Sequence, residues 1–308
     1  MGLRIKTNVA SLNAQRNLSN STNELRESSS RLSSGNRINK SADDAAGLAI
    51  SENLRADVRS LSQAKRNAND AVSLVQTAEG GLMETTNMLI RLRELAVQAA
   101  SDTIGNKERS FIDKEYVALK DEIDRIANAT EFNGTRLLVG DGENISDELK
   151  TGSNEYPLEI QVGKDFFEGA DSGDSANPVN IIRIDLQSLN AFASGEGSLD
   201  LGSGEEGTRV TTKEGGQMAI GKLDNAIEKV NDYRSYLGAI QNRFQSSISN
   251  LGVAIENMSA ARSRIRDTDY AAETAAYTQT KILQQAGTSV LSQANAAPQI
   301  ALSLLNSM

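Results

Sequence analysis

The chain of 308 residues contains neither cysteine nor histidine. Without cysteine there is no disulfide, no thiolate nucleophile and no thiolate zinc site. Without histidine there is no imidazole to act as a general acid or base near neutral pH, or to bind a metal. Carboxylate chemistry remains formally open, because the chain has 41 acidic residues. These absences argue against an enzyme and predict that the protein needs no cofactor and no metal.

Long apolar runs are also absent. No stretch approaches the roughly 18 consecutive apolar residues that predict a membrane-spanning helix. The first ten residues lack the apolar central region of a cleavable secretory signal. If the protein leaves the cell, we expect it to do so by another route, without inserting into a membrane.

Proline and aromatic residues are scarce. The three prolines stand at 157, 178 and 298, so residues 1–156 and 179–297 are free of proline, as long helices require. The middle of the chain has a different composition: 14 of the 24 glycines lie between Gly134 and Gly216. Residues 141–217 hold 16 acidic and 5 basic residues, and the rest of the chain is close to neutral. This composition predicts helical ends around an acidic, glycine-rich middle.

Apolar residues repeat every seven positions in two stretches, from Leu54 to Ala96 and from Leu223 to Ile265. Six unbroken intervals in each stretch exceed the roughly three or four heptads that identify a coiled coil. An aromatic content of only 4% suits elongated helices better than a compact core. We predict two long helices that pack along a common seam formed by Leu54, Leu61, Val75, Leu82, Leu89, Leu223, Val230, Leu237, Phe244, Leu251, Met258 and Ile265.

Local signals refine the first helical half. Ser41 and Asp44 have the spacing of a capping pair at a helix start. Residues 103–106 separate the first long helix from a shorter apolar stripe over 112–126. The pair Gly80-Gly81 lies inside the long helix, where each glycine costs about 1 kcal/mol relative to alanine. We expect packing to offset this cost or a local kink to relieve it.

The two extreme ends carry further apolar stripes. One comprises Leu18, Leu25 and Leu32, and the other runs from Leu283 through Val290 to Leu304 with alanines between. Neither stripe can bury itself alone, and isolated helices are marginal in water. We therefore predict that the terminal helices lack a sufficient partner within the chain and become ordered only on association.

The middle segment contains two β-type runs, at 156–162 and 179–186, the second with clear alternation of apolar and polar residues. They predict a small exposed β-containing domain. The fold class is therefore mainly α: a long antiparallel coiled-coil bundle built from both chain ends, with a small β-containing outer domain in the middle.

Two motifs in the middle do not hold up as ligand sites. Gly202–Gly207 fits the glycine pattern of dinucleotide sites, but no strand is expected before it, and Glu205-Glu206 would repel a pyrophosphate. The pair Asp171 and Asp174 could suggest calcium, but an EF-hand loop would then need its last acid at Ile182. The seven scattered basic residues among the first 40 are also not interleaved with aromatics, which argues against nucleic acid as a partner.

The segments that carry these stripes resemble bacterial flagellins over about residues 1–140 and 217–305. The matching motifs are residues 31–50, 63–70, 93–98, 237–244, 263–270 and 282–291. The middle matches no particular pattern, as is typical of the variable middle of this family. The resemblance implies a structural subunit of the flagellar filament, a homopolymer that serves swimming motility and assembles by packing of its N- and C-terminal helices.

The resemblance also implies a layered subunit. Residues 1–40 and 267–308 would form a terminal helical domain that lines the filament. Residues 41–140 and 217–266 would form the helical core domain, and residues 141–216 a variable, solvent-facing outer domain that polymerisation does not require. The subunit would be secreted and would lie in the extracellular filament of the bacterial flagellum.

Partners follow from the same resemblance. They are other copies of the chain, a flagellin export chaperone, the flagellar type III export apparatus, and the filament cap and hook-junction proteins. Some flagellins are also sensed by a host Toll-like receptor. The matching patch here is Arg91, Leu95, Gln98 and Glu115, residues that would also face neighbouring subunits.

Three alternative functions compete with this one, and the sequence argues against the second. A hook–filament junction protein shares the terminal helices of flagellins. A flagellin with a metallopeptidase in its middle domain would need two histidines on one helix, and the chain has none. A soluble coiled-coil signalling adaptor is the third, and polymerisation after seeding would discriminate against it.

Overall fold

A computed structural model describes residues 7–140, 157–165, 179–186, 189–193, 198–202 and 207–306, with side chains up to residue 296. The sequence motifs at 171–174 and 203–206 lie outside these residues. Helices dominate the fold: α1 (Val9–Ser34), α2 (Ala45–Ala99), α3 (Asn106–Ala129), α4 (Lys213–Arg266) and α5 (Tyr270–Asn306). Four short strands form two antiparallel pairs, β1 (Glu131–Phe132) with β2 (Thr135–Arg136), and β3 (Leu158–Gln161) with β4 (Ile181–Ile184). The predicted mainly α fold with a small β-containing middle is confirmed.

The chain divides into two compact units, which we describe separately. The terminal unit contains residues 1–58 and 256–308, and the central unit contains residues 59–255. No helix in the described part of the chain combines the length and the apolar character needed to cross a bilayer.

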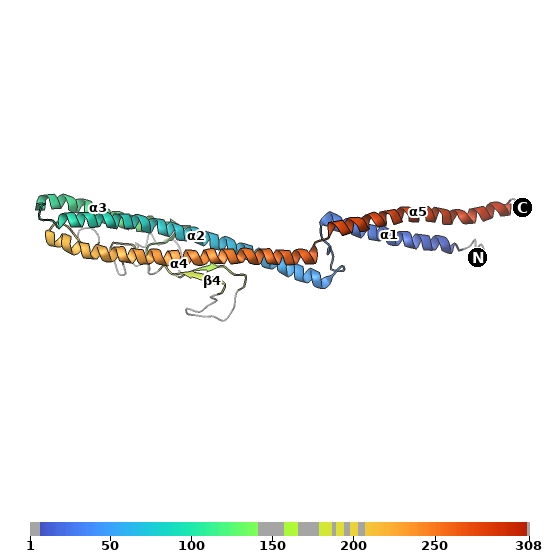
Figure 1. The fold of residues 1–308 in the computed structure, drawn as a ribbon, viewed down its shortest axis with the longest axis horizontal. Coiled ribbons are helices and arrows are strands. Elements are labelled where there is room, and N and C mark those ends of the chain that lie inside the picture. Colours follow the sequence, from blue (N-terminus) through green and yellow to red (C-terminus); the bar gives the residue numbers. More distant parts are fainter. Residues whose placement is uncertain are drawn as a thin grey trace. The chain divides into compact units, whose positions relative to one another are not determined.

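In the central unit, α2, α3 and α4 lie side by side (Figure 1). Arg93, near the end of α2, bonds Asp224, near the start of α4. Lys65, nearer the start of α2, lies near Gly252, toward the end of α4. The two helices are therefore antiparallel. Their facing side chains share one hydrophobic core with α3, β4 and the segment that leads back to α4. A third helix and a covering segment thus enclose the α2–α4 seam.

The long α2 helix runs through Gly80 and Gly81 without interruption. A methyl group added at Gly81 would lie 2.7 Å from both the Thr130 hydroxyl and a Leu138 methyl, so only glycine lets this segment pack so closely on α2. The same addition at Gly80 would meet nothing within 4 Å. Packing therefore accounts for Gly81, and nothing in the structure explains Gly80.

The start of α2 differs from the predicted capping pair. The Asp44 carboxylate accepts a hydrogen bond of 2.8 Å from the Gly47 amide, and the Asp44 carbonyl accepts one from Leu48. Asp44 is therefore itself the N-cap, because its side-chain oxygen satisfies a free amide of the first turn. The prediction that Ser41 caps this helix was wrong.

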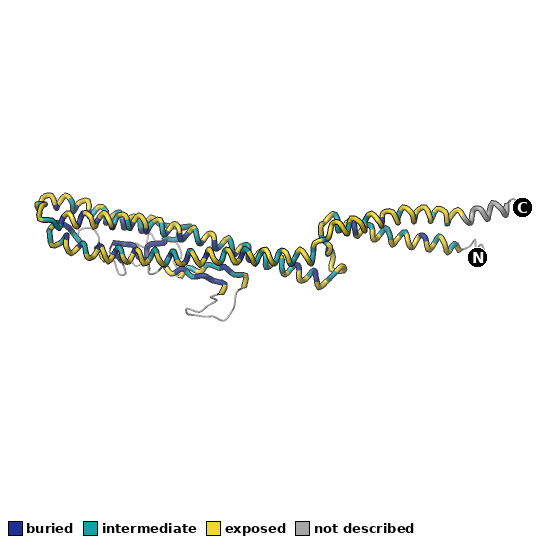
Figure 2. The backbone as a smooth tube through the Cα atoms, viewed as in Figure 1, coloured by how far each residue is buried: buried dark blue, intermediate teal, exposed yellow. Residues whose placement is uncertain are grey.

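The terminal unit pairs α1 with α5, in an antiparallel arrangement (Figure 1). Asn8, before α1, donates to the Ala294 carbonyl near the far end of α5, while Arg31 lies 3.9 Å from Glu273 at the beginning of α5. The expectation that the terminal helices lack a partner within the chain was wrong in this respect, because each lies against the other. Figure 2 shows that both helices nevertheless remain largely exposed or half-buried.

The two glycines of α2 give a matched pair of substitutions. We expect Gly80→Ala to stabilise the protein by about 0.5–1 kcal/mol, because alanine favours the helix and meets open space. Gly81→Ala should destabilise it by about 1–3 kcal/mol, because the new methyl overlaps Thr130 and Leu138. Urea unfolding of monomers followed by circular dichroism measures both, and equal effects would contradict the packing at Gly81.

The seam predicts a second contrast. Leu237 is fully buried, so Leu237→Ala should lower the free energy of unfolding by about 2–5 kcal/mol. Val253, on the same helix, is exposed, so Val253→Ala should change it by no more than about 0.5 kcal/mol. Similar losses for the two variants in thermal melts would show that the helix register is wrong.

Candidate assembly surface

The predicted seam residues fall into two groups. Leu61, Val75, Leu82, Leu89, Leu223, Val230, Leu237, Phe244 and Leu251 are buried in the central unit. Leu54, Met258 and Ile265 belong to the terminal unit and are half-buried. The heptad repeat thus passes from a stretch where its residues are buried into one where only partial burial is reached.

The α1–α5 pair buries few side chains. On α1 only Ala14 and Ser28 are buried, and among the described side chains of α5 only Thr280 is. Leu18 packs on the α5 backbone at Gly287, where an added methyl would lie 3.4 Å from a Leu18 methyl. Thr280, Gln284 and Gly287 are small or polar residues of α5 that face α1, and Gln284 reaches Thr22 at 3.5 Å.

The two predicted terminal stripes, on α1 and α5, differ in how far this helix pair buries them. Leu18, Leu25 and Leu32 are half-buried in the pair. Leu283 and Val290, by contrast, are half exposed, and the side chain of Leu304 lies outside the described residues. The apolar stripe of α5 therefore points away from α1 rather than toward it.

The outward face of α5 presents a shallow, open apolar surface, which we call the α5 groove. It is formed by Tyr270, Ala271, Thr274, Ala275, Thr278, Gln279, Ile282 and Leu283. Ile282 is 59% exposed, and Val9 and Leu12 on α1 are exposed to a similar degree. An apolar surface of this kind on an otherwise polar helix pair is typical of an interface.

Between the helices of the terminal unit, the two connecting segments are tied to each other. Asn36 and Asp267 form an antiparallel bridge, the Thr268 amide donates to the Gly35 carbonyl, and the Arg37 amide donates to the Arg266 carbonyl. Gly35 ends α1 in the left-handed conformation with φ of 71°, which glycine adopts without strain.

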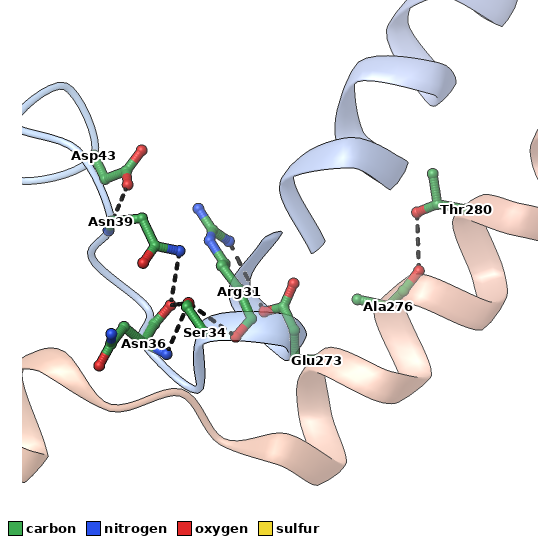
Figure 3. A network of polar contacts seen from close by, with 8 residues as sticks. All are labelled: Arg31, Ser34, Asn36, Asn39, Asp43, Glu273, Ala276 and Thr280. Atoms are coloured by element: carbon green, nitrogen blue, oxygen red, sulfur yellow. Dashed lines mark hydrogen bonds and ion pairs between the residues drawn. The ribbon is translucent and has the colours of Figure 1, made fainter. Parts of the chain in front are cut away.

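Figure 3 shows the polar contacts beside this bridge. The Asp43 carboxylate accepts from the amides of Asn39 and Lys40, and these backbone hydrogen bonds lower the pKa of Asp43. Arg31 reaches Glu273 from the end of α1. The segment that leads into α2 is therefore ordered by its own polar groups as well as by the bridge.

Only some residues of the predicted patch on α2 and α3 are exposed. Arg91, Gln98 and Glu115 are exposed, but Leu95 is 2% exposed and packs in the core. Its assignment to the exposed patch was wrong, because it stands at a core-facing position of α2. Arg91 bonds Glu115 at 2.8 Å and Glu94 at 2.9 Å, and the hydrogen bond that Arg91 donates to Glu115 is the main reason that the pKa of Arg91 is raised.

Sequence reasoning missed an exposed apolar stripe beside this patch. Met83, Ile90 and Val97 stand one position after seam residues and are each about half exposed. Their spacing of seven residues could have revealed this stripe, but the more strongly apolar repeat at 82, 89 and 96 obscured it. Among the described residues, no group of three or more acidic side chains is placed to hold a metal ion.

Comparisons with known proteins point to one family. The family profile described as "Bacterial flagellin N-terminal helical region" matches residues 5–143, and the profile described as "Bacterial flagellin C-terminal helical region" matches residues 220–305. A protein named Flagellin from Halalkalibacterium halodurans is 40% identical over 98% of this chain and 99% of its own length. Flagellin A from Vibrio cholerae serotype O1 is 38% identical over 99% of this chain and all of its own length.

A solved structure of a putative flagellar hook-associated protein from Vibrio parahaemolyticus has a TM-score of 0.54 to this chain. It covers 73% of this chain and all of its own, at 14% sequence identity. At that identity the likeness shows a shared fold alone.

Proposed function

The chain belongs to the bacterial flagellin family, and on that premise we propose that its terminal helix pair carries the principal assembly surface of the subunit. As a flagellin it is a structural subunit of the extracellular flagellar filament, and it assembles with copies of itself. The proposal concerns which residues perform that assembly.

The observation that carries the proposal is the outward apolar face of α5. The α1–α5 pair leaves Ile282, Leu283 and Val290 half exposed, together with Val9 and Leu12 on the other helix. Each of these side chains is already about half buried, so covering the rest contributes about half of the roughly 1.5–3 kcal/mol that full burial of such a side chain provides. In a polymer the same face on every subunit can be covered by its neighbours, so that exposure in the monomer becomes driving force for assembly.

We extend the proposal to the layers of the subunit. Residues 1–40 and 267–308 line the filament, and residues 41–140 and 217–266 form the core around them. The acidic middle faces solvent, where its negative charge keeps filaments soluble. The exposed apolar stripe of Met83, Ile90 and Val97 suits a contact between core regions of neighbouring subunits.

Arg91 and Gln98 directly follow the stripe residues Ile90 and Val97 on α2, and Glu115 lies on α3. Together, Arg91, Gln98 and Glu115 form the exposed part of the predicted patch. We propose that it faces neighbouring subunits and that, on free monomers, a host flagellin-sensing Toll-like receptor can bind it. Leu95 is buried in the core and would hold α2 in position beneath the patch.

The remaining partners are proposed on family membership. They are an export chaperone that covers the C-terminal helix, the type III export apparatus, and the cap and hook-junction proteins. We propose no catalytic activity, because the sequence lacks histidine and cysteine and the family is structural. A role at the hook–filament junction has less support, since full-length relatives near 40% identity are named flagellin.

The assembly surface can be tested at a single position. Ile282→Glu places a charge on the groove and should abolish filament growth on seeds, since the partner surface could no longer exclude water. Ile282→Leu keeps the position apolar and should polymerise at close to the unsubstituted rate. Light scattering and negative-stain electron microscopy measure growth, and circular dichroism verifies that both monomers fold.

Because Ile282 is mostly exposed in the monomer, neither substitution should shift the melting of the central unit. Filaments of normal length from the Ile282→Glu variant would exclude the α5 groove as the principal interface. A loss of growth in both variants would point instead to a tight steric requirement at this position.

A further inference from the structure

One face of α3 is polar yet covered. Asp113, Tyr116, Lys120 and Asp124 follow one another at spacings of three and four, so they share that face. Asp113, Tyr116 and Lys120 are buried, and Asp124 is half-buried. Buried charges are costly unless they are paired or hydrogen-bonded, so their partners reveal what this face does. We call these four residues the polar strip.

The first member holds the end of the middle segment. The Asp113 carboxylate accepts 2.7 and 3.0 Å hydrogen bonds from the Arg209 guanidinium and a 2.9 Å bond from the Val210 amide. Both carboxylate oxygens are thus engaged by neighbouring residues of one segment. Val210 itself is fully buried in the core.

Tyr116, Lys120 and Asp124 bond residues that come earlier in the same segment. Lys120 donates to the carbonyls of Gly202 and Thr208, both at 3.1 Å, and Tyr116 lies 3.2 Å from the Thr208 hydroxyl. The Asp124 carboxylate accepts a 2.7 Å hydrogen bond from the Ala193 amide. Most of these bonds address main-chain atoms, so they constrain the path of the segment more than its side chains.

The α4 helix holds the segment from another side. Lys229 donates to the Ser198 carbonyl at 2.8 Å, and Lys222 lies within reach of Asp200. Between these polar contacts the segment buries apolar side chains in the core of the central unit, namely Leu189, Ala191, Phe192, Ala193, Leu199, Leu201 and Val210. Residues 189–210, where described, are therefore built into the core.

Gly202 and Gly207 have a role in this path. Gly202 has a φ of 72°, and an added methyl there would collide with the Gly207 backbone. The Thr208 amide and hydroxyl both donate to the Leu201 carbonyl, which holds these two residues together beside Lys120. The glycines that imitate a dinucleotide motif in the sequence are explained by this close backbone approach.

Segments on the two sides of the middle of the chain meet at adjacent points. Val139 and Asn190 form an antiparallel bridge, and the Ala191 amide donates to the Leu138 carbonyl at 3.0 Å. The residues between these points therefore form a loop with neighbouring ends, although Val162, Ile182, Ile184 and Leu186 within it also pack in the core. The entropy of closing such a loop changes only slowly with its length, so its length can vary while its two ends stay fixed.

We propose that the polar strip is a clamp that makes residues 189–210 a permanent part of the core, so that any exchangeable part of the subunit ends before residue 189. This rests on the proposed function only in taking the middle of the chain as the outer layer. It moves the inner boundary of that layer from 216 to 188.

The clamp is tested first by Lys120→Met in the full-length monomer. This change removes the hydrogen bonds from the Lys120 ammonium to the Gly202 and Thr208 carbonyls while filling nearly the same volume, and Lys114→Met, at an exposed position of α3, is the control. Amide hydrogen exchange at Leu201, Thr208 and Val210 should become at least tenfold faster in Lys120→Met and stay unchanged in Lys114→Met. Unchanged rates in both variants would overturn the proposal.

If Lys120→Met does not fold, Asp124→Ala decides, because Asp124 is only half-buried and holds one amide. Exchange should then accelerate selectively at Ala193. Exchange at Ala193 that stays as slow as in the unsubstituted chain would contradict the clamp.

Two excisions test the boundary. Replacing 143–187 with a short Gly/Ser joint should leave a helical monomer that melts cooperatively, at a lowered temperature because β3 and β4 are lost. Replacing only 194–207 should abolish the cooperative transition, although it removes fewer residues, because Lys120 then loses its acceptor at Gly202 and the core loses Leu199 and Leu201. The reverse ranking would refute the boundary. Since every readout is made on monomers, a failure to form filaments would count against the assembly surface and leave the clamp standing.

Discussion

A helix can hide its whole apolar surface only if neighbours cover it on more than one side, and this constraint governs both units of the chain. In the central unit, α2 and α4 are covered by α3, β4 and the returning segment 189–210, and the seam is almost fully excluded from water. In the terminal unit, α1 and α5 have only each other along their length, and few side chains are buried. One unit is complete in the monomer, and the other leaves an apolar face for another molecule.

The contrast explains why the same kind of heptad pattern has different outcomes along the chain. Leu237 and Phe244 are fully buried, whereas Met258 and Ile265 continue the repeat and reach only half burial. Sequence periodicity reports which face of a helix is apolar, and it contains no information about how many neighbours will cover that face. The apolar face of each helix therefore follows from the sequence pattern, while the degree to which that face is buried does not.

Other features were beyond sequence reasoning for separate physical reasons. The direction of the apolar stripe of α5 depends on Thr280 and Gly287 permitting close approach of α1 on the opposite face. Leu95 was placed on the surface by resemblance, although it occupies a core position of α2. The β1–β2 hairpin was not predicted, despite the Asn133-Gly134 turn with positive φ at both residues that signals it. The polar strip on α3 looks like solvated surface until its partners, some 80 residues away, are in place.

The central claim is that assembly completes the burial that the α1–α5 pair leaves unfinished. Amide hydrogen exchange, compared between free monomer and filament at each residue of α1, α5 and the central unit, tests it most directly. The account predicts that protection along α1 and α5 rises by at least a hundredfold in the filament, whereas buried amides of the central unit change little. Equal protection of the terminal helices in monomer and filament would contradict the account.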